Sequence, residues 1–284
     1  MRKIIFLDID GTLTGYDGWI PPSVSTACRS ARSKGHLLYI CSGRPRLFIS
    51  KEILDIGFDG VISAGGAYIE AGNNIILNAM IPVETVINIT NYLNLHKCGF
   101  LLEKSYIALS SHFLITYWEN IIEGNPSLKR DIKFIDFINR ITENQLPENP
   151  EPYHYEGINK MVFMINNEVS FDDVKQAIGI NCEIFRGSVP YCGNEGGEIG
   201  PPGIHKGSAV ERIAEYHGIS LDDTIAFGDS DNDRKMIERA GIGIAMGNAS
   251  ADLKTIADDV TNSFDNDGIF NGFVKYGLIS EMPV

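Results

Sequence analysis

Two aspartates, Asp8 and Asp10, directly follow a short apolar segment near the start of the chain. Residues 4–7 show no polar alternation, which is typical of a strand buried on both faces. Gly11 then gives the backbone the freedom to turn. Carboxylates are costly to bury, and a hard cation such as Mg²⁺, which prefers oxygen ligands, would offset that cost. The pattern indicates a cation site at a strand end, although an ordinary acidic turn explains the same spacing.

A second acidic cluster stands in an equivalent place later in the chain. Asp229 follows the apolar segment 223–228, and Ser42 follows another apolar segment, 36–41. In an open parallel sheet, ligands bind at the carboxyl ends of strands near a switch in strand order. If the three strands are neighbours, Asp8, Ser42 and Asp229 converge on one crevice. This coincidence favours a functional site more strongly than either cluster does alone.

Other known site patterns do not fit these residues. Residues 229–240 begin like a calcium loop, but Arg234 stands at the sixth position, which requires Gly, and Ala240 at the twelfth, which requires Glu. The glycines of 241–247 miss the dinucleotide-binding spacing by one residue. No GxxxxGK[ST] phosphate loop occurs in the sequence.

The composition of the chain limits the classes of partner. Its 284 residues carry a formal net charge of −13, which argues against nonspecific binding to nucleic acid or to an anionic membrane. A small phosphorylated metabolite stays compatible, because a bound cation reverses the field inside one cleft. We expect no signal peptide and no membrane span. The five cysteines show no CxxC spacing, so we expect a cytoplasmic protein, either a monomer or a small homo-oligomer.

The elements that carry these residues alternate between strands and helices. The expected strands are 3–7, 36–41, 60–63, 223–228 and 241–246, and the expected helices are 23–34, 45–56, 204–216 and 250–256. Such alternation predicts an α/β fold with a doubly wound, mostly parallel, Rossmann-like sheet that is covered by helices on both faces.

The pattern changes in the middle of the chain, where short strands and helices predict a separate α+β insert. We place this insert at 82–192, between two core segments, 1–81 and 193–284. The glycine-rich tract 193–197 is expected to be the hinge back to the core.

Four short motifs together resemble those of the haloacid dehalogenase superfamily, in the family's order and with roughly its spacing. They are Asp8-Ile9-Asp10-Gly11-Thr12, Ser42-Gly43-Arg44, Lys206-Gly207 and Gly228-Asp229-Ser230-Asp231-Asn232-Asp233. The insert resembles the large α/β cap (type IIB) of Cof-type sugar-phosphate phosphatases. The resemblance covers essentially the whole chain.

The resemblance implies a role for each motif residue. Asp8 would be the nucleophile that becomes a phosphoaspartate, and Asp10 would be the general acid and base. Asp8, Asp229 and the backbone carbonyl of Asp10 would bind Mg²⁺. The remaining motif residues would bind phosphate (Ser42, Gly43, Lys206 and Asn232) or support the site (Asp233, which would orient Lys206 or bound water, and Arg44).

Each of these residues has an ordinary structural explanation when it is taken alone. Ser42 could belong to a simple turn, Lys206 could be a solvated lysine, and Asp233 could be a favourable acid at a helix start. Their joint occurrence predicts a Mg²⁺-dependent phosphatase that acts on a small phosphomonoester, with a sugar phosphate as the expected substrate. A phosphomutase with the same fold, or a non-enzymatic phosphate or metal-binding module, is the alternative.

Two regions bear on substrate choice. Many relatives have Asn-Gly-Ala where this chain has Gly65-Gly66-Ala67, which could change a contact to a substrate hydroxyl. In the insert, residues 153–155 (Tyr-His-Tyr) and Lys160 are candidate lid contacts, although aromatic packing also explains the first three.

Overall fold

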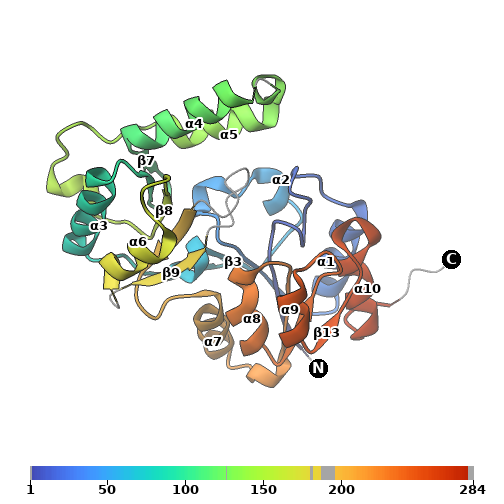
Figure 1. The fold of residues 1–284 in the computed structure, drawn as a ribbon. Helices are drawn as coiled ribbons and strands as arrows, with labels where there is room; N and C mark the ends of the chain where they lie inside the picture. The colour runs from blue at the N-terminus through green and yellow to red at the C-terminus, as the bar shows by residue number, and fades with distance from the viewer. Residues whose placement is uncertain (1, 126, 180–181, 187–195, 281–284) are drawn as a thin grey trace. The chain divides into compact units, whose positions relative to one another are not determined.

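The computed structural model describes residues 2–125, 127–179, 182–186 and 196–280. The chain divides into two compact units, residues 1–78 with 204–284 and residues 79–203. The first unit contains a mainly parallel sheet and the second has an antiparallel sheet of its own (Figure 1). This confirms the predicted α/β fold with an α+β insert.

The sheet of the first unit has eight strands in the order β13-β12-β11-β1-β2-β3-β4-β5. These strands are β1 (Ile4–Leu7), β2 (Leu37–Cys41), β3 (Gly60–Ser63), β4 (Tyr68–Ala71), β5 (Asn74–Asn78), β11 (Thr224–Gly228), β12 (Ile242–Ala245) and β13 (Asp259–Val260). All neighbours are parallel except β3–β4 and β4–β5 at one edge. The chain runs outward from β1 on one side and from β11 on the other, so the switch in strand order lies between these two strands.

Helices cover both faces of this sheet. On one face lie α1 (Pro22–Ser33), α2 (Lys51–Leu54) and α10 (Gly268–Lys275), and on the other lie α7 (Lys206–His217), α8 (Arg234–Arg239) and α9 (Ala251–Ile256). Ile5 and Leu7 of β1 belong to the first apolar cluster, and Ile4 and Phe6 belong to the second. Because both faces are buried, the strand needs no polar residue, which explains its uninterrupted apolar sequence.

The single helix expected over 45–56 is wrong. The segment forms a 3₁₀ turn, Arg46–Phe48, and then the short helix α2, with Ile49 and Ser50 in extended conformation between them. Ile49 and Ile53 are both buried in the core. Both side chains reach the same core although the helix is interrupted between them.

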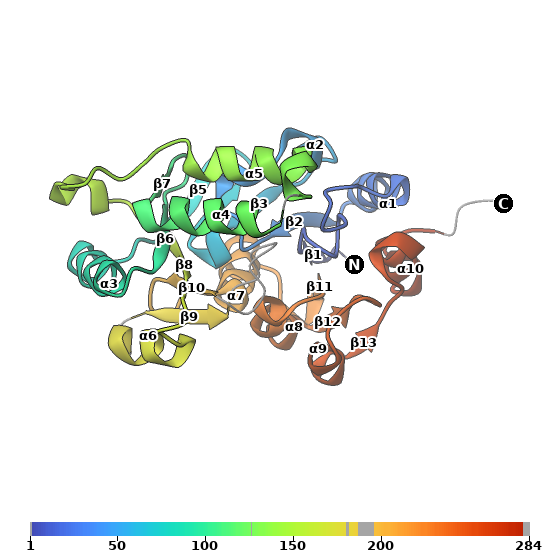
Figure 2. The ribbon, with the colours of Figure 1, turned by 45° about the horizontal axis from the view of Figure 1, so that its top comes forward.

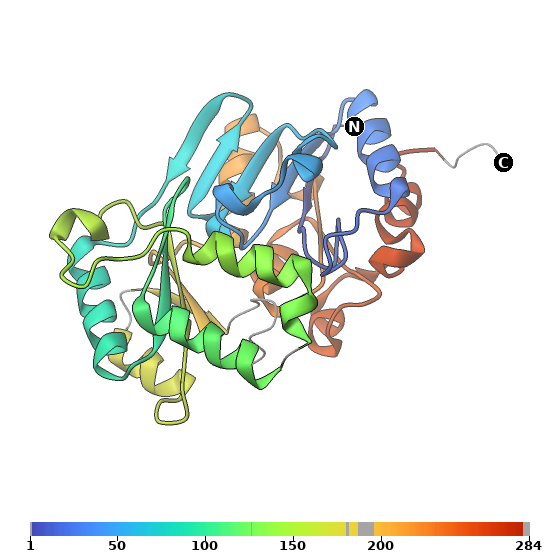
Figure 3. The ribbon, with the colours of Figure 1, turned by 90° about the horizontal axis from the view of Figure 1, so that it is seen from above.

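The second unit contains a five-stranded antiparallel sheet in the order β7-β6-β8-β10-β9. Its strands are β6 (Gly99–Glu103), β7 (Ala108–Ser110), β8 (Lys160–Met164), β9 (Glu183–Arg186) and β10 (Gly196–Gly200). Helices α3 (Val83–Leu95) and α6 (Phe171–Ile178) pack on one face in a single apolar cluster. Two further helices, α4 (His112–Gly124) and α5 (Ile132–Thr142), lie side by side (Figures 2 and 3).

The second unit begins before and ends after the predicted insert 82–192. Its end differs because part of the expected hinge, 193–197, is strand β10, which pairs with both β8 and β9. A side chain at Gly197 would collide with the rings of Phe163 and Phe171. The glycine is there to admit these rings, not to give flexibility. Residues 193–195 of the expected hinge lie outside the described residues.

Candidate active site

The strand order brings the two acidic segments together. β1 pairs in parallel with β11, with Leu7 opposite Phe227, so Asp8 and Asp229 leave neighbouring strands at the same edge. The Asp8 N–H donates to the carbonyl of Phe227 at 3.1 Å. β2 lies on the other side of β1 and leads into Ser42. All three polar side chains are almost fully buried, and the predicted convergence of these strand ends is confirmed.

Lys206 joins this cluster from the first turn of α7. Its Nζ lies 2.7 Å from Asp8 Oδ1, 2.6 Å from Asp233 Oδ1 and 3.2 Å from Asn232 Oδ1. Burial by itself would lower the pKa of Lys206, but the Asp233 and Asp8 carboxylates raise that pKa overall. At Gly207, a Cβ would stand only 2.4 Å from the Lys235 carbonyl oxygen. The glycine thus allows the start of α7 to pack closely on the backbone of α8.

Asp233 fixes the loop after β11. It is fully buried, and its Oδ2 accepts hydrogen bonds from the N–H groups of Asp229 at 3.0 Å and Ser230 at 3.2 Å. A Cβ on Gly228 would lie 2.6 Å from the Asp233 side chain. The glycine that ends β11 therefore makes room for this acid, whose oxygens bind Lys206 and the loop backbone.

Negative charge exceeds positive charge at the centre of the cluster. Carboxylate oxygens of Asp8, Asp229 and Asp233 lie within 4.8 Å of one another, whereas Lys206 forms ion pairs with Asp8 and Asp233. Burial, followed by repulsion from Asp233, raises the pKa of Asp8 well above its usual value and that of Asp229 to about 7. Asp229 Oδ1 is buried without a hydrogen-bond partner. Because an oxygen-binding cation would relieve both costs, these residues fit a hard divalent metal.

The Asp10 carboxylate, which is expected to act as general acid and base, pairs with an arginine. Its carboxylate forms a two-pronged ion pair with Arg44, in which Nε lies 2.9 Å from Oδ2 and Nη2 lies 2.6 Å from Oδ1. Both side chains are about 30% exposed. The structure therefore brings Asp8, Lys206, Asn232, Asp229 and Asp233 into one cluster and places the Asp10 carboxylate beside it, on Arg44.

The segment around Ser42 is held by backbone contacts. The Ser42 N–H donates to the Ile62 carbonyl at 2.9 Å, and its Oγ accepts from the N–H of Arg44 at 3.1 Å. The Ser42 carbonyl accepts from Gly65 at 3.0 Å. Gly65 has φ +65° with open space around it, whereas a Cβ at Gly66 would lie 2.7 Å from the carbonyl oxygen of His205. Gly66 is thus required by packing, and Gly65 leaves space beside the Ser42 segment.

Two residues of this region were not expected from the sequence. The Tyr16 hydroxyl donates to Asp229 Oδ2, and nothing in the turn-rich segment around Tyr16 indicated that contact. Asn248 donates from Nδ2 to the Gly11 carbonyl at 2.8 Å and accepts at Oδ1 from the N–H of Phe264 at 3.1 Å. Asn248 lies in the loop after β12, so the rule that ligands gather at parallel strand ends would have indicated it.

The candidate lid residues of the second unit have structural partners. Lys160 is buried on the sheet, with Nζ 3.2 Å from Glu103 Oε2 and 3.3 Å from Glu198 Oε2. Tyr155 belongs to the apolar core of the unit, and Tyr153 is exposed and stacked on His154. Packing and ion pairing therefore account for Tyr155 and Lys160.

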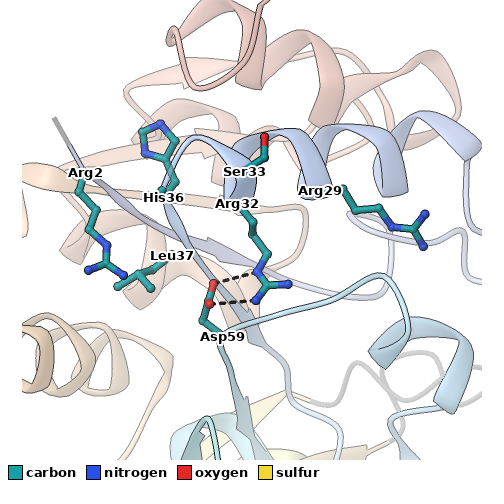
Figure 4. Close-up of a pocket in the computed structure, with 8 residues that line it drawn as sticks. Arg2, Arg29, Arg32, Ser33, His36, Leu37 and Asp59 are labelled. Atoms are coloured by element: carbon teal, nitrogen blue, oxygen red, sulfur yellow. Dashed lines mark hydrogen bonds and ion pairs between the residues drawn. The ribbon is translucent and has the colours of Figure 1, made fainter.

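A cavity of about 420 Å³ on the first unit is lined by none of the residues of the acidic cluster (Figure 4). Arg2, Arg29 and Arg32 line it at the amino-terminal ends of β1 and β2. Arg32 is paired with Asp59 at 3.1 Å, and the Arg29 side chain extends away from that pair in Figure 4. The arginines do not converge on one point, so the acidic cluster is the better candidate for chemistry.

Comparisons with known proteins identify the family of this chain. The family model for haloacid dehalogenase-like hydrolases matches residues 5–273. The chain therefore belongs to this family of hydrolases. Within the family it is a Cof-type phosphatase, which confirms the predicted family and enzyme class.

Three relatives illustrate the similarity. YkrA of Bacillus subtilis strain 168, which is named as a candidate phosphatase, is 29% identical over 280 residues, covering 98% of each chain. The 5-amino-6-(5-phospho-D-ribitylamino)uracil phosphatase YwtE of the same organism is 26% identical over 94% of this chain and 95% of its own. The solved structure of BT4131, a subclass IIB sugar phosphatase, superimposes with a TM-score of 0.79 at 28% identity, covering 98% of this chain and 100% of that one.

Within the described part of the chain, every helix is too short or too polar to cross a membrane.

Proposed function

We propose that this phosphatase hydrolyses a small phosphomonoester, a sugar phosphate, with Mg²⁺ and through a phosphoaspartate formed on Asp8. The observation that carries the proposal is the buried contact of 2.7 Å between Asp8 Oδ1 and Lys206 Nζ, beside the unpartnered Asp229 Oδ1. Asp8 is held by one lysine and lies near a second carboxylate that has an oxygen without a partner. Once a cation is bound there, Asp8 is suited to approach an anionic substrate.

The residues that would hold Mg²⁺ are Asp8, Asp229 and the backbone carbonyl of Asp10. When bound, the ion would supply positive charge that lets the anionic nucleophile approach phosphate and that stabilises charge on the transferred group. Asp233 is less available as a ligand, because its oxygens already accept hydrogen bonds from Lys206 and two backbone N–H groups.

Asp8 would attack through its free oxygen. An oxygen–phosphorus bond would form at Asp8 while the bond from phosphorus to the leaving oxygen breaks. Lys206 holds Asp8 Oδ1 and so fixes the direction of the other oxygen, while Ser42 Oγ and the N–H of Gly43 would hold phosphoryl oxygens. Asn232, whose Oδ1 binds Lys206, would add a phosphate contact through its amide nitrogen.

Asp10 would move the protons. Protonated, it would give its proton to the leaving oxygen; as a carboxylate, it would then take a proton from the water that attacks the phosphoaspartate. This step releases inorganic phosphate and restores Asp8. In the structure Arg44 stabilises the Asp10 carboxylate, so Asp10 would leave this pair to act as the acid, and Arg44 would hold the base form between turnovers.

Hydrolysis is favoured over the two alternatives because the family and its named relatives are phosphatases. A sugar phosphate is proposed from BT4131, whereas YwtE offers a ribityl phosphate as the second substrate to test. A cytoplasmic location and a monomeric or small homo-oligomeric state stay predictions.

The test is phosphate release from a panel of sugar phosphates and the ribitylaminouracil phosphate, with Mg²⁺ and with a chelator. We expect turnover only with Mg²⁺, and its loss in Asp8→Asn. Asp231→Asn is the matched control, because Asp231 belongs to the same motif as Asp229 but has a side chain that is 78% exposed and pairs with Arg234. Activity retained by Asp8→Asn would remove Asp8 as nucleophile, and activity in chelator would remove the metal.

A further inference from the structure

Tyr16 lies outside the four motifs, yet it contacts one of the proposed metal-binding residues. Its hydroxyl donates to Asp229 Oδ2, and the other oxygen, Oδ1, is the buried atom without a hydrogen-bond partner. The two oxygens of this carboxylate thus have different surroundings. Oδ2 accepts the hydrogen bond from Tyr16, whereas Oδ1 is available to a ligand.

The local backbone is shaped to permit this contact. A Cβ at Gly11 would lie 2.2 Å from Asp229 Oδ2 and 2.9 Å from the Tyr16 hydroxyl oxygen, and Gly11 has φ +75°. Any other residue at this position would therefore separate the tyrosine from the carboxylate. The glycine makes room for the pair as well as for the turn.

The turn that carries Tyr16 is fixed by hydrogen bonds and by packing. It is closed by hydrogen bonds from Gly15 to the Trp19 carbonyl at 2.9 Å and from Gly18 to the Gly15 carbonyl at 2.9 Å. A Cβ at Gly15 would lie 2.9 Å from the ring of Phe264, so the turn packs closely on that ring. These contacts fix the loop that places the Tyr16 hydroxyl on Asp229, although 61% of the tyrosine is exposed.

We propose that Tyr16 is a positioning residue for cation binding, and that its hydroxyl holds Asp229 in the rotation that directs Oδ1 into the acidic cluster. The inference rests on the proposed function, in which Asp229 binds Mg²⁺. A carboxylate that can rotate freely must be ordered when the ion binds, whereas one held by a hydrogen bond is ordered in advance. Partners of this kind change metal affinity by about 10–100-fold when they are removed.

The experiment measures Mg²⁺ binding to the full chain by titration calorimetry, after removal of metal with a chelator and without substrate. Tyr16→Phe removes the hydroxyl and keeps the ring. Tyr276→Phe is the matched control, because the Tyr276 hydroxyl donates to Asp259 Oδ2 at 2.7 Å in the same unit, away from the acidic cluster. Asp229→Asn shows the effect of losing the charged ligand itself.

We expect the Kd for Mg²⁺ to rise about 10–100-fold in Tyr16→Phe and to stay at the wild-type value in Tyr276→Phe. The unfolding midpoints of the two metal-free variants should shift to a similar extent, because each loses one tyrosine–aspartate hydrogen bond. Equal or tighter Mg²⁺ binding by Tyr16→Phe overturns the inference and leaves the proposed function standing. A wild-type chain that does not bind Mg²⁺ overturns the metal dependence in the proposed function, and the inference with it.

Discussion

Each unit of this protein buries a lysine between two carboxylates, and the two arrangements differ in what they leave unpaired. In the second unit, Lys160 lies between Glu103 and Glu198, which come from the strands on either side of its own. In the first unit, Lys206 lies between Asp8 and Asp233, and a third carboxylate, Asp229, has a buried oxygen, Oδ1, without a hydrogen-bond partner. Glu103 Oε2 of the second unit also lacks a hydrogen bond, but it lies 3.2 Å from the Lys160 ammonium group. The first cluster can therefore accept a further cation.

The origin of the residues differs as well. The Lys160 group is built on strand positions, so the register of one sheet fixes it. The Lys206 group is assembled from a helix start and from segments that follow two strands, and it depends on loops. Burial of charge alone thus does not mark a catalytic centre. The distinguishing observation is a buried carboxylate oxygen, Asp229 Oδ1, that has no hydrogen-bond partner and lies at the carboxyl end of a parallel strand.

The largest expected effect separates the two lysines. Lys206→Met should lower kcat by about 10²–10³-fold, because it removes a charged donor from the reacting carboxylate. Lys160→Met should instead lower the free energy of unfolding by about 3–5 kcal/mol, because it leaves two buried acids without their cation, while kcat of the folded protein stays near wild type. Steady-state kinetics and urea unfolding of both variants check this. A similar loss of kcat in both variants would contradict the distinction between a catalytic lysine and a structural one.

The second prediction concerns pH and the second unit. Burial raises the pKa of Glu103 from 4.5 to about 7. The folded state therefore binds the proton more tightly than the unfolded state, so this group favours folding at low pH. Its contribution is lost as pH rises from about 4.5 through 7, and a shift of this size corresponds to about 3 kcal/mol.

Glu103→Gln should remove that dependence, so its stability should change less than that of the wild type between pH 5 and pH 8. Urea unfolding in chelator at four or five pH values measures the difference. Parallel curves for the two proteins would show that Glu103 titrates at its ordinary value.

The third prediction concerns the unpartnered oxygen in the first unit. Mg²⁺ at 100 times its Kd should raise the free energy of unfolding by about 2.7 kcal/mol. Asp229→Asn should abolish that gain, whereas Glu198→Gln should preserve it. Thermal unfolding with Mg²⁺ and with chelator gives the measurement. A gain retained in Asp229→Asn would place the cation elsewhere.

Much of the first unit could be predicted, because its central strands β1, β2, β3 and β11 are buried. Their sequences are therefore mainly apolar and easy to identify as strands. The convergence of Asp8, Ser42 and Asp229 followed from a general property of parallel sheets. The register of the second sheet could not be predicted, since the partners of Lys160 come from strands far apart in the chain. Gly197 was expected to be part of a hinge for a related reason. It makes room for the ring of Phe163, and no local sequence pattern shows that contact.

Contacts made by loop residues also could not be predicted from the sequence. Tyr16 contacts Asp229 from a turn whose sequence shows only that the chain bends. Asn248 follows a parallel strand, so its place could be predicted, but its contact with the Gly11 carbonyl could not. The ion pair between Asp10 and Arg44 likewise joins two motifs, and each motif alone gives no sign of it. Spacing in a sequence identifies which residues meet at a strand end more readily than it identifies their partners.

The smallest expected effect compares two asparagines. Asn248 donates to the Gly11 carbonyl at 2.8 Å in the first unit, and Asn159 donates to the Ala79 carbonyl at 2.7 Å in the second. Each asparagine also accepts a second hydrogen bond at Oδ1, Asn248 from the N–H of Phe264 and Asn159 from the Ser105 hydroxyl. Replacing either with Ala should therefore lower the free energy of unfolding by about 2 kcal/mol, at about 1 kcal/mol for each hydrogen bond that is lost. Only Asn248→Ala should also lower kcat, since Gly11 directly follows Asp10. Calorimetry and kinetics of the pair measure both quantities, and an equal loss of kcat in Asn159→Ala would mean that the chemistry does not depend on this loop in particular.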